Sequence, residues 1–353
     1  MRYALVLLVA AAVLAMAAMA DSAAPAPARW IAFHADPRGS GDLFLDSPDG
    51  RQRRRLTRFF SQIPTATWSP DGSRLALLAR PRGVVDIYVI DADGRNLRQL
   101  TRDEGDHFGD VAWSPDGQSL AFTCCGEDNP AIYTMHADGT GRARIADDAG
   151  QPAWAPDGDH IAYISFRDGT QPELYVATPD GSDPRRLTSN RAADTDPVWS
   201  PDSGHMAFTS ERTGRAQVFV MDADGANQRR LAVDRWSDQR PVWSKDGSRL
   251  AFTSFRNRDP NLLGIGNAEV VVARVDGSAV RNLTHSPAWD GEPAWSVDGK
   301  KIAFATRRDF GPRGIFRVGV MTASGTNVRL LPAVAGEGNA GGKANSCCPA
   351  WQP

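Results

Sequence analysis

One short motif recurs along this chain and restricts what it can fold into. It is a tryptophan followed by a tight-turn sequence, as in Trp113-Ser-Pro-Asp-Gly117. Successive copies begin 45, 41, 45, 44, 52 and 56 residues apart, and the last copy keeps only its tryptophan, close to the end of the chain. A near-constant period of this length, with several short strand-like runs per unit, is typical of a β-propeller. The seven tryptophans are Trp68, Trp113, Trp154, Trp199, Trp243, Trp295 and Trp351.

Each repeat unit contains four strand-like segments. A Pro-Asp-Gly sequence joins the first two segments and an Ala-Asp-Gly sequence joins the last two. Both sequences favour tight turns, because proline fixes φ near the value a turn needs and glycine tolerates a positive φ. The Asp-Ala-Asp-Gly copies at 91–94 and 222–225 resemble fragments of a calcium loop. They lack its spaced ligands, so we interpret them as hairpin turns. In one unit the segments are residues 110–113, 120–123, 131–135 and a fourth that begins at 144.

The two ends of the chain complement each other. The first unit lacks its first strand, because Trp30 to Phe33 matches a second strand, and the chain ends on an isolated first strand within residues 348–352. A ring closed by pairing of these two ends leaves no open sheet edge. The sequence therefore predicts an all-β propeller of seven four-stranded blades, closed by the C-terminal strand in the N-terminal blade, with six blades as the alternative.

The repeat resembles the WD40-like repeats of the TolB propeller family. The resemblance rests on the Trp-Ser-Pro-Asp-Gly motif, on Leu-Ala-Phe-Thr-Ser, on residues 87–94 and on a closing Leu-Thr, and covers residues 29–353. It implies a propeller in the cell envelope. TolB itself has an α/β domain before a six-bladed propeller, and the pattern here departs from it on both points. Similar repeats also occur in prolyl-oligopeptidase-like enzymes and in oligogalacturonate lyases.

The first residues have the pattern of an export signal. Arg2 precedes an apolar run, and Ala18-Met-Ala20 is a small-residue cleavage site. We expect a signal peptide at 1–20, a disordered lead-in at 21–28 and the propeller domain at 29–353, with an uncleaved anchor as the alternative for the leader. The mature protein is then periplasmic or secreted, with no transmembrane anchor.

Composition narrows the choice of partners. The formal net charge is −2, which creates no overall field for nucleic acid or an anionic membrane. The sequence has no G-x-S-x-G, H-E-x-x-H or P-loop motif. We therefore expect a monomer without cofactor, catalytic residues or bound metal, whose partner is an envelope protein, a peptide or a glycan.

Loops of variable length and charge should share one face of the ring. In a four-stranded meander, the loops between strands two and three and between successive units lie opposite the uniform turns, and variable loops on a rigid scaffold usually carry binding. We expect a charged binding rim there, or alternatively a ring of Asp–Arg pairs between blades that only holds the loops together. The candidate rim residues are Asp110, Asp194, Asp196, Asp238, Asp290, Glu292, Arg167, Arg212, Arg256 and Arg308.

The cysteines form two adjacent pairs on the same face. An even number in an exported protein favours disulfides, either vicinal or long-range, and a redox or metal role is the alternative. The candidates are Cys124, Cys125, Cys347 and Cys348.

Two functions are consistent with this sequence. The first is a non-enzymatic binding or scaffold propeller. The second is a metal-assisted carbohydrate-active enzyme similar to oligogalacturonate lyases. Clustering of His34, His107 and His285 on the variable face would favour the enzyme, because histidines are common metal ligands.

Overall fold

The structure is a computed structural model that describes most of the propeller region. The expected signal peptide and lead-in lie outside the described residues. The described residues are 30–35, 41–58, 65–80, 84–102, 109–124, 130–232, 234–257, 267–308, 317–334 and 349–353.

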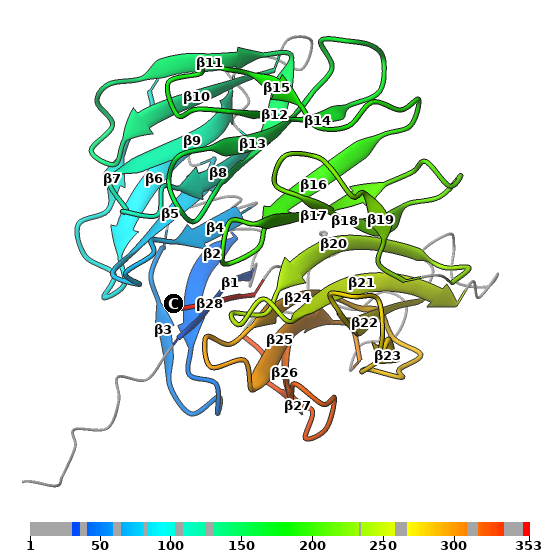
Figure 1. Ribbon diagram of the computed structural model, residues 1–353. Helices are drawn as coiled ribbons and strands as arrows, with labels where there is room; N and C mark the ends of the chain where they lie inside the picture. The colour runs from blue at the N-terminus through cyan, green and yellow to red at the C-terminus, as the bar shows by residue number, and fades with distance from the viewer. Residues whose placement is uncertain are drawn as a thin grey trace, which may run out of the picture.

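Seven antiparallel four-stranded sheets form a ring (Figure 1). The described part of the chain contains no helix, and accordingly none that could cross a membrane. Blade 1 consists of β28 (Ala350–Trp351), β1 (Ile31–Ala35), β2 (Asp42–Asp46) and β3 (Arg53–Arg55). Blade 2 consists of β4 (Thr65–Trp68), β5 (Arg74–Ala79), β6 (Asp86–Asp91) and β7 (Arg98–Gln99). Blade 3 consists of β8 (Gly109–Trp113), β9 (Ser119–Cys124), β10 (Ala131–His136) and β11 (Ala143–Asp147).

The remaining four blades repeat the same order. Blade 4 consists of β12 (Ala149–Trp154), β13 (Ile161–Ser165), β14 (Glu173–Ala177) and β15 (Arg185–Arg186). Blade 5 consists of β16 (Asp194–Trp199), β17 (His205–Ser210), β18 (Gln217–Asp222) and β19 (Arg229–Arg230). Blade 6 consists of β20 (Ser237–Trp243), β21 (Arg249–Asn257), β22 (Asn267–Arg274) and β23 (Arg281–Asn282). Blade 7 consists of β24 (Asp290–Trp295), β25 (Lys301–Thr306), β26 (Arg317–Thr322) and β27 (Arg329–Leu330).

The last strand closes the ring as predicted. β28 pairs antiparallel with β1, with Trp351 opposite Ile31 and Ala350 opposite Ala32. The seven sheets confirm the seven-blade interpretation and exclude the alternative of six. The first strands of successive blades contact one another around the ring, which places them nearest its axis.

Six of the seven repeat tryptophans hydrogen-bond their blade to the preceding one, whereas the indole N–H of Trp154 has no hydrogen-bond partner among the described residues. In the six, the indole Nε1 donates to a backbone carbonyl one residue before the tryptophan of the preceding blade, so each ring spans an interface. This contact explains why the motif needs tryptophan, whose apolar body and single N–H both find a partner. The six bonds are Trp68 to Ala350, Trp113 to Thr67, Trp199 to Ala153, Trp243 to Val198, Trp295 to Val242 and Trp351 to Ala294, at 3.0–3.2 Å.

The core is divided among the blade interfaces. Second and third strands contribute aliphatic and aromatic side chains to seven buried clusters, one between each pair of neighbouring blades. The closing Leu-Thr of each unit supports this packing. Thr188, for example, accepts from the Leu174 N–H at 2.9 Å and donates to Glu173 at 2.6 Å, which satisfies a buried carboxylate at the start of β14.

The uniform turns are fixed by short hydrogen bonds. Ser114 donates from Oγ to Asp116 at 2.5 Å and accepts from the Ser119 N–H at 2.9 Å, and the same bonds recur in the copies that keep serine and aspartate. The Asp-Ala-Asp-Gly segments are hairpin turns, as predicted, since Asp91 and Arg95 bond across one of them at 3.0 Å.

Glycine in the turn between strands three and four permits close blade contact. Gly277 has φ of 84°, and a Cβ there would lie 2.6 Å from the carbonyl oxygen of Leu231 in the preceding blade. We expect Gly277→Ala to destabilise the protein by the cost of a left-handed alanine, about 1–2 kcal/mol, plus roughly 1–3 kcal/mol for the clash. Gly214 has φ of 86° and open space around it, so Gly214→Ala should be destabilising only by the cost of the left-handed alanine. Equal urea midpoints for the two variants would contradict the close-contact explanation.

Candidate functional site

Three of the predicted rim carboxylates are buried at the start of a first strand, five residues before its tryptophan. Asp194 forms an ion pair with Arg212 at 2.9 Å, and Asp290 pairs with Arg308 at 2.7 Å. Both aspartates are fully buried, and each pair lies within one blade, whereas pairs between blades were the structural alternative considered from the sequence. These groups hold the variable loops onto their own blades, and their binding role stays a prediction.

The third buried carboxylate, Asp238 of blade 6, is arranged differently. The arginine of its blade, Arg256, pairs with Asp234 at 3.3 Å, and Asp238 Oδ1 has no hydrogen-bond partner among the described residues. Burial, and next the nearby Asp234 charge, raises the pKa of Asp238 to about 7, against the opposing effects of Ser254, Arg256 and Arg230. Blade 6 therefore carries a buried carboxyl group that titrates close to neutrality.

This shift predicts a pH-dependent contribution to stability. Because the pKa is raised from 3.8 to about 7, the folded protein binds the proton more tightly than the unfolded chain. Stability is therefore lost as pH rises between these values, by at most about 1.4 kcal/mol per pH unit. Asp238→Asn, which is neutral throughout, should gain stability relative to the wild type across this window in urea unfolding. A constant difference between the two proteins from about pH 4 to about pH 8 would refute the shift.

Three of the four predicted rim arginines lie over aromatic rings, Arg167 and Arg212 over a pair of rings and Arg308 over one. Arg212 stacks 4.7 Å from the ring of Phe219, and Arg308 lies 5.6 Å from Phe304. Arg167 stacks 4.5 Å from Tyr175, and its Nη2 donates to the Tyr163 hydroxyl at 2.9 Å. Such stacking holds a guanidinium in one orientation.

A second set of polar residues lies three positions before the tryptophan and faces the axis. Each adopts a left-handed backbone conformation, with φ of 26°, 54°, 54°, 55° and 52° in blades 3 to 7. In each case the ladder to the second strand is irregular at this point, as in a β-bulge, which turns a side chain out of the sheet. We call these residues the mouth ring. They are Asp110, Gln151, Asp196, Arg240 and Glu292.

Contacts within the mouth ring cross from blade to blade. The Asp196 N–H donates to Gln151 Oε1 at 2.8 Å, and the Gln151 N–H bonds to the Asp110 carboxylate. On the other side of the ring, Arg240 forms an ion pair with Glu292. The neighbouring threonines support the bulges, since Thr209 accepts from the Arg240 N–H at 3.3 Å.

The electrostatics of the mouth ring centre on Asp110. Surrounding protein raises the pKa of this exposed carboxyl group, the negative charge of Asp196 raises it further, and Arg240 opposes both. Asp110 belongs to blade 3, whereas Asp196 and Arg240 belong to blades 5 and 6, so both act on Asp110 from blades that are not its neighbours. A site of this kind can bind an ammonium or guanidinium group, because a cation would relieve the repulsion between the two carboxylates.

Sequence reasoning identified three mouth-ring members and missed two. Asp110, Asp196 and Glu292 were predicted as rim residues because they are acidic and begin inner strands. Gln151 was missed because it is uncharged, and Arg240 because arginines were expected in the loops between strands two and three. Counting three residues back from each tryptophan would have found both of them.

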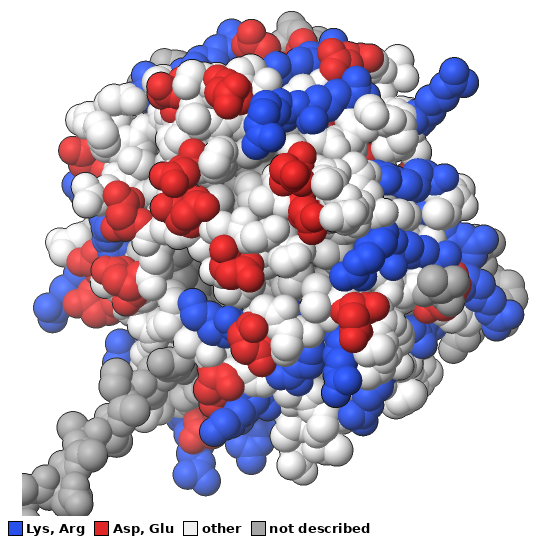
Figure 2. All heavy atoms as spheres, in the orientation of Figure 1, with Lys and Arg blue, Asp and Glu red and all other residues white. Residues whose placement is uncertain are grey.

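Charged groups on the surface are intermixed. Figure 2 shows one face of the molecule, with several acidic groups in its middle and arginine and lysine groups around them. This pattern agrees with the small net charge and with binding by local groups.

The histidines do not gather in the described part of the structure. His34 is buried in β1, and His285 is exposed with φ of 42°. His107 lies outside the described residues. Among the described residues, no group of three or more His, Cys, Asp or Glu side chains is arranged to hold a metal ion.

The structure describes one of the four candidate disulfide cysteines. Cys124, at the buried end of β9, is disulfide-bonded. Cys125, Cys347 and Cys348 lie outside the described residues, and the connectivity stays a prediction. Oxidised Cys124 agrees with an exported chain.

Several solved structures share this architecture. TolB from Acinetobacter baumannii is 21% identical with a TM-score of 0.56, over 92% of this chain and 82% of its own. An oligogalacturonate lyase from Vibrio parahaemolyticus is 15% identical with a TM-score of 0.61, over 88% of each chain. A puromycin-hydrolyzing peptidase from Mycobacterium tuberculosis is 16% identical with a TM-score of 0.62, over 86% of this chain and 55% of its own. At these identities the similarity establishes the fold alone.

Comparison with known sequences identifies the family of this protein. No curated protein matches the chain. The sequence profile of the TolB beta propeller domain matches residues 15–150 and 146–265, which together are well over half of the chain. The repeat, the seven closed blades and this match agree, and the protein belongs to the TolB beta propeller domain family.

Proposed function

We propose that this protein is an exported, non-enzymatic binding propeller that captures an extended, positively charged peptide segment at the mouth ring. The observation that carries the proposal is the convergence of five polar side chains, one from each of blades 3 to 7, on left-handed bulges at the variable-loop end of the axis. A left-handed conformation of a non-glycine residue costs about 1 kcal/mol. The bulge that accompanies this conformation in all five blades turns one polar side chain per blade out of its sheet at the same level of the ring, which supports a shared binding site there.

The charge balance of the mouth ring favours a cationic ligand. Arg240 is neutralised by Glu292, which leaves Asp110 and Asp196 as uncompensated carboxylates. A lysine or arginine side chain, or an amino terminus, can form charge-assisted hydrogen bonds with both. Gln151 adds an amide that can bond to a peptide backbone.

Binding without turnover fits the chemistry of these groups. Carboxylate, amide and guanidinium groups recognise and orient a ligand, whereas acyl or phosphoryl transfer would need a nucleophile beside a base or a bound metal. Export is supported by the leader sequence and by the disulfide-bonded Cys124.

Fluorescence anisotropy with labelled peptides tests the proposal. A short lysine-containing peptide should bind saturably, and more weakly as salt is added, while the same peptide with glutamate in place of lysine should not bind. The same affinity for both peptides, or none for either, would overturn the proposal.

The carbohydrate-lyase alternative rests on the shared fold with oligogalacturonate lyases, one of which was solved in complex with manganese. Incubation with oligogalacturonate and manganese should leave the substrate intact if our proposal holds. Unsaturated sugar products in the ultraviolet spectrum would replace the binding function with the enzymatic one.

A further inference from the structure

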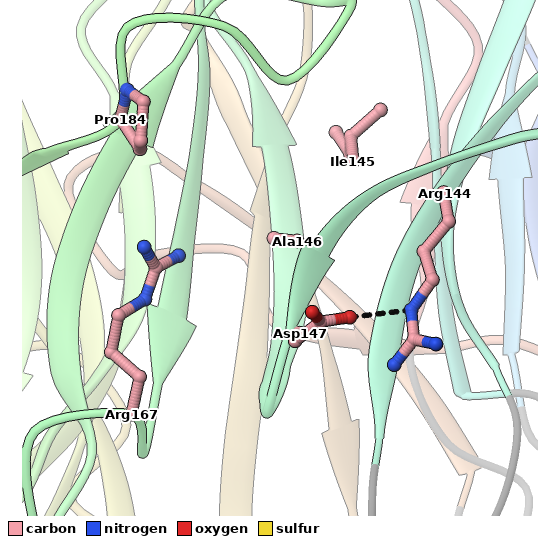
Figure 3. A pocket seen from close by; sticks show the side chains of 6 residues that line it. All are labelled: Arg144, Ile145, Ala146, Asp147, Arg167 and Pro184. Carbon is pink, nitrogen blue, oxygen red and sulfur yellow. Dashed lines mark ion pairs between the residues drawn. The ribbon is translucent and has the colours of Figure 1, made fainter.

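A pocket of about 420 Å³ lies on the flank of the ring, between the outer strand of blade 3 and blade 4 (Figure 3). Arg144 and Asp147 of β11 line one side of the pocket, and Arg167 of the β13–β14 connection lines the other. The volume is within the range of small-molecule sites, toward its lower end. The lining residues are Arg144, Ile145, Ala146, Asp147, Arg167 and Pro184.

The junction between blades 3 and 4 differs from the other junctions. β11 has five residues, whereas the fourth strands of the other blades have two or three. A single residue, Asp148 with φ of 47°, joins β11 to β12. The connection between the two blades is therefore too short to cover β11, three of whose five residues are exposed.

Arg167 occupies the position in blade 4 that Arg212 and Arg308 occupy in blades 5 and 7, but blade 4 has no aspartate to pair with it. In blades 5 and 7, an aspartate at the start of the first strand pairs with an arginine 18 positions later, as Asp194 does with Arg212. The residue 18 positions before Arg167 is Ala149. Arg167 accordingly forms no ion pair with any described residue, whereas Arg212 and Arg308 each have a fully buried partner.

A second partner is missing at the same place. Arg212 donates from Nη1 to the side-chain oxygen of Gln228, at 2.7 Å, just before the fourth strand of blade 5. The corresponding residue of blade 4 is Pro184, which lines the pocket and offers no side-chain acceptor. Nη1 of Arg167 therefore has no hydrogen-bond partner within the described structure.

The guanidinium of Arg167 is nevertheless held in place. It stacks 4.5 Å from the ring of Tyr175, and its Nε donates to Ser165 at 3.2 Å. Its Nη2 donates to the buried Tyr163 hydroxyl at 2.9 Å. A preorganised cation loses little side-chain freedom when it binds an anion.

The geometry points to a binding site for a monocarboxylate with an apolar body, in which the ligand takes the place of the missing aspartate. Two arginines face one aspartate in the pocket, and Asp147 is already paired with Arg144 at 2.5 Å, so one positive charge is uncompensated. Ile145, Ala146 and Pro184 provide an apolar wall. A peptide carboxy terminus and a free acylated amino acid share this chemistry.

Calorimetric titration with simple probes tests the site. N-acetyl-leucine should bind saturably, and N-acetyl-leucinamide, which lacks the charge, should bind at least about tenfold more weakly. An acetylated tripeptide ending in leucine distinguishes a peptide carboxy terminus from a free acylated amino acid as the ligand. Tighter binding of the tripeptide would assign a peptide terminus, and equal binding would assign a free monocarboxylate.

Two variants and a control place the ligand at Arg167. Ala149→Asp places an aspartate 18 residues before Arg167, as in blades 5 and 7. The protein should stay folded, and binding should be abolished because the new carboxylate pairs with the Arg167 guanidinium in place of the ligand. Arg167→Gln should also abolish binding, whatever the fate of the first variant. Arg191→Gln, which removes an exposed arginine from the β15–β16 connection, should leave binding unchanged.

Absence of saturable binding by the wild type, equal binding of acid and amide, or unchanged binding in Arg167→Gln would each overturn the inference. The pocket lies apart from the mouth ring, so these results are independent of the proposed peptide capture. Binding of cationic peptides at the axis should be unaffected by all three substitutions.

Discussion

Deletion of residues 349–353 should lower the free energy of unfolding by at least about 3–5 kcal/mol, the typical cost of removing a buried tryptophan. This short segment joins three blades. Trp351 donates to Ala294 of blade 7 at 3.0 Å, and Ala350 accepts from Trp68 of blade 2 at 3.1 Å. Gln352 bonds to Trp30 in blade 1 and donates from Nε2 to Gly72 at 2.8 Å.

The loss is large because it also opens a sheet edge. Without β28, the inner edge of β1 has no backbone partner, and the clusters on both sides of blade 1 lose contacts. Removal of Pro353 alone is the matched control, since it leaves Trp351 and Gln352 in place. Differential scanning calorimetry should separate the two truncations by many degrees. Equal melting temperatures would show that the C-terminal strand does not close the ring.

Reversal of charge at two mouth-ring positions should abolish peptide capture without unfolding the protein. Asp196→Lys removes one of the two carboxylates that bind the cation, a charge-assisted bond worth about 1.5–3 kcal/mol. Glu292→Lys leaves Arg240 without its ion pair and adds a second cation that repels the peptide. We expect affinity for the lysine-containing peptide to fall at least about 100-fold. Both side chains are partly exposed at the axis, so the melting temperature should change little.

A single substitution at the same site should act in the opposite direction. Arg240→Gln removes the cation of the mouth ring and releases Glu292 from its ion pair, so the cationic peptide should bind several-fold more tightly. If the double reversal unfolds easily yet still captures the peptide, the carboxylates are structural and the binding surface lies elsewhere.

The fold could be predicted in detail because its determinants are local and repeated. The turn residues, the alternating apolar strands and the interface tryptophan recur in each unit, and closure follows from the missing strand at one end and the extra strand at the other. Even the Leu-Thr ending has a local cause, since threonine satisfies an acidic residue at the start of strand three in four blades, as Thr188 does for Glu173.

The candidate site was predicted only in part, because charge alone does not show which way a side chain faces. Asp194 and Asp196 are two residues apart in β16, yet the first is buried against Arg212 and the second lies in the mouth ring. Asp196 lies in the bulge that changes the register of β16 between Thr195 and Val198, and register is a property of the strand pair. The spacing of 18 residues between aspartate and arginine was available in the sequence and would have marked Asp194 and Asp290 as partners within a blade.

Photo-crosslinking of the bound peptide tests the central claim most directly. A lysine-containing peptide with a photoreactive group should, after illumination and mass spectrometry, attach to peptides that contain the first-strand starts of blades 3 to 7, where the mouth ring lies. Competition with unlabelled peptide should remove these crosslinks. Crosslinks confined to the Pro-Asp-Gly turns on the opposite face, or to the outer strands, would contradict capture at the mouth ring.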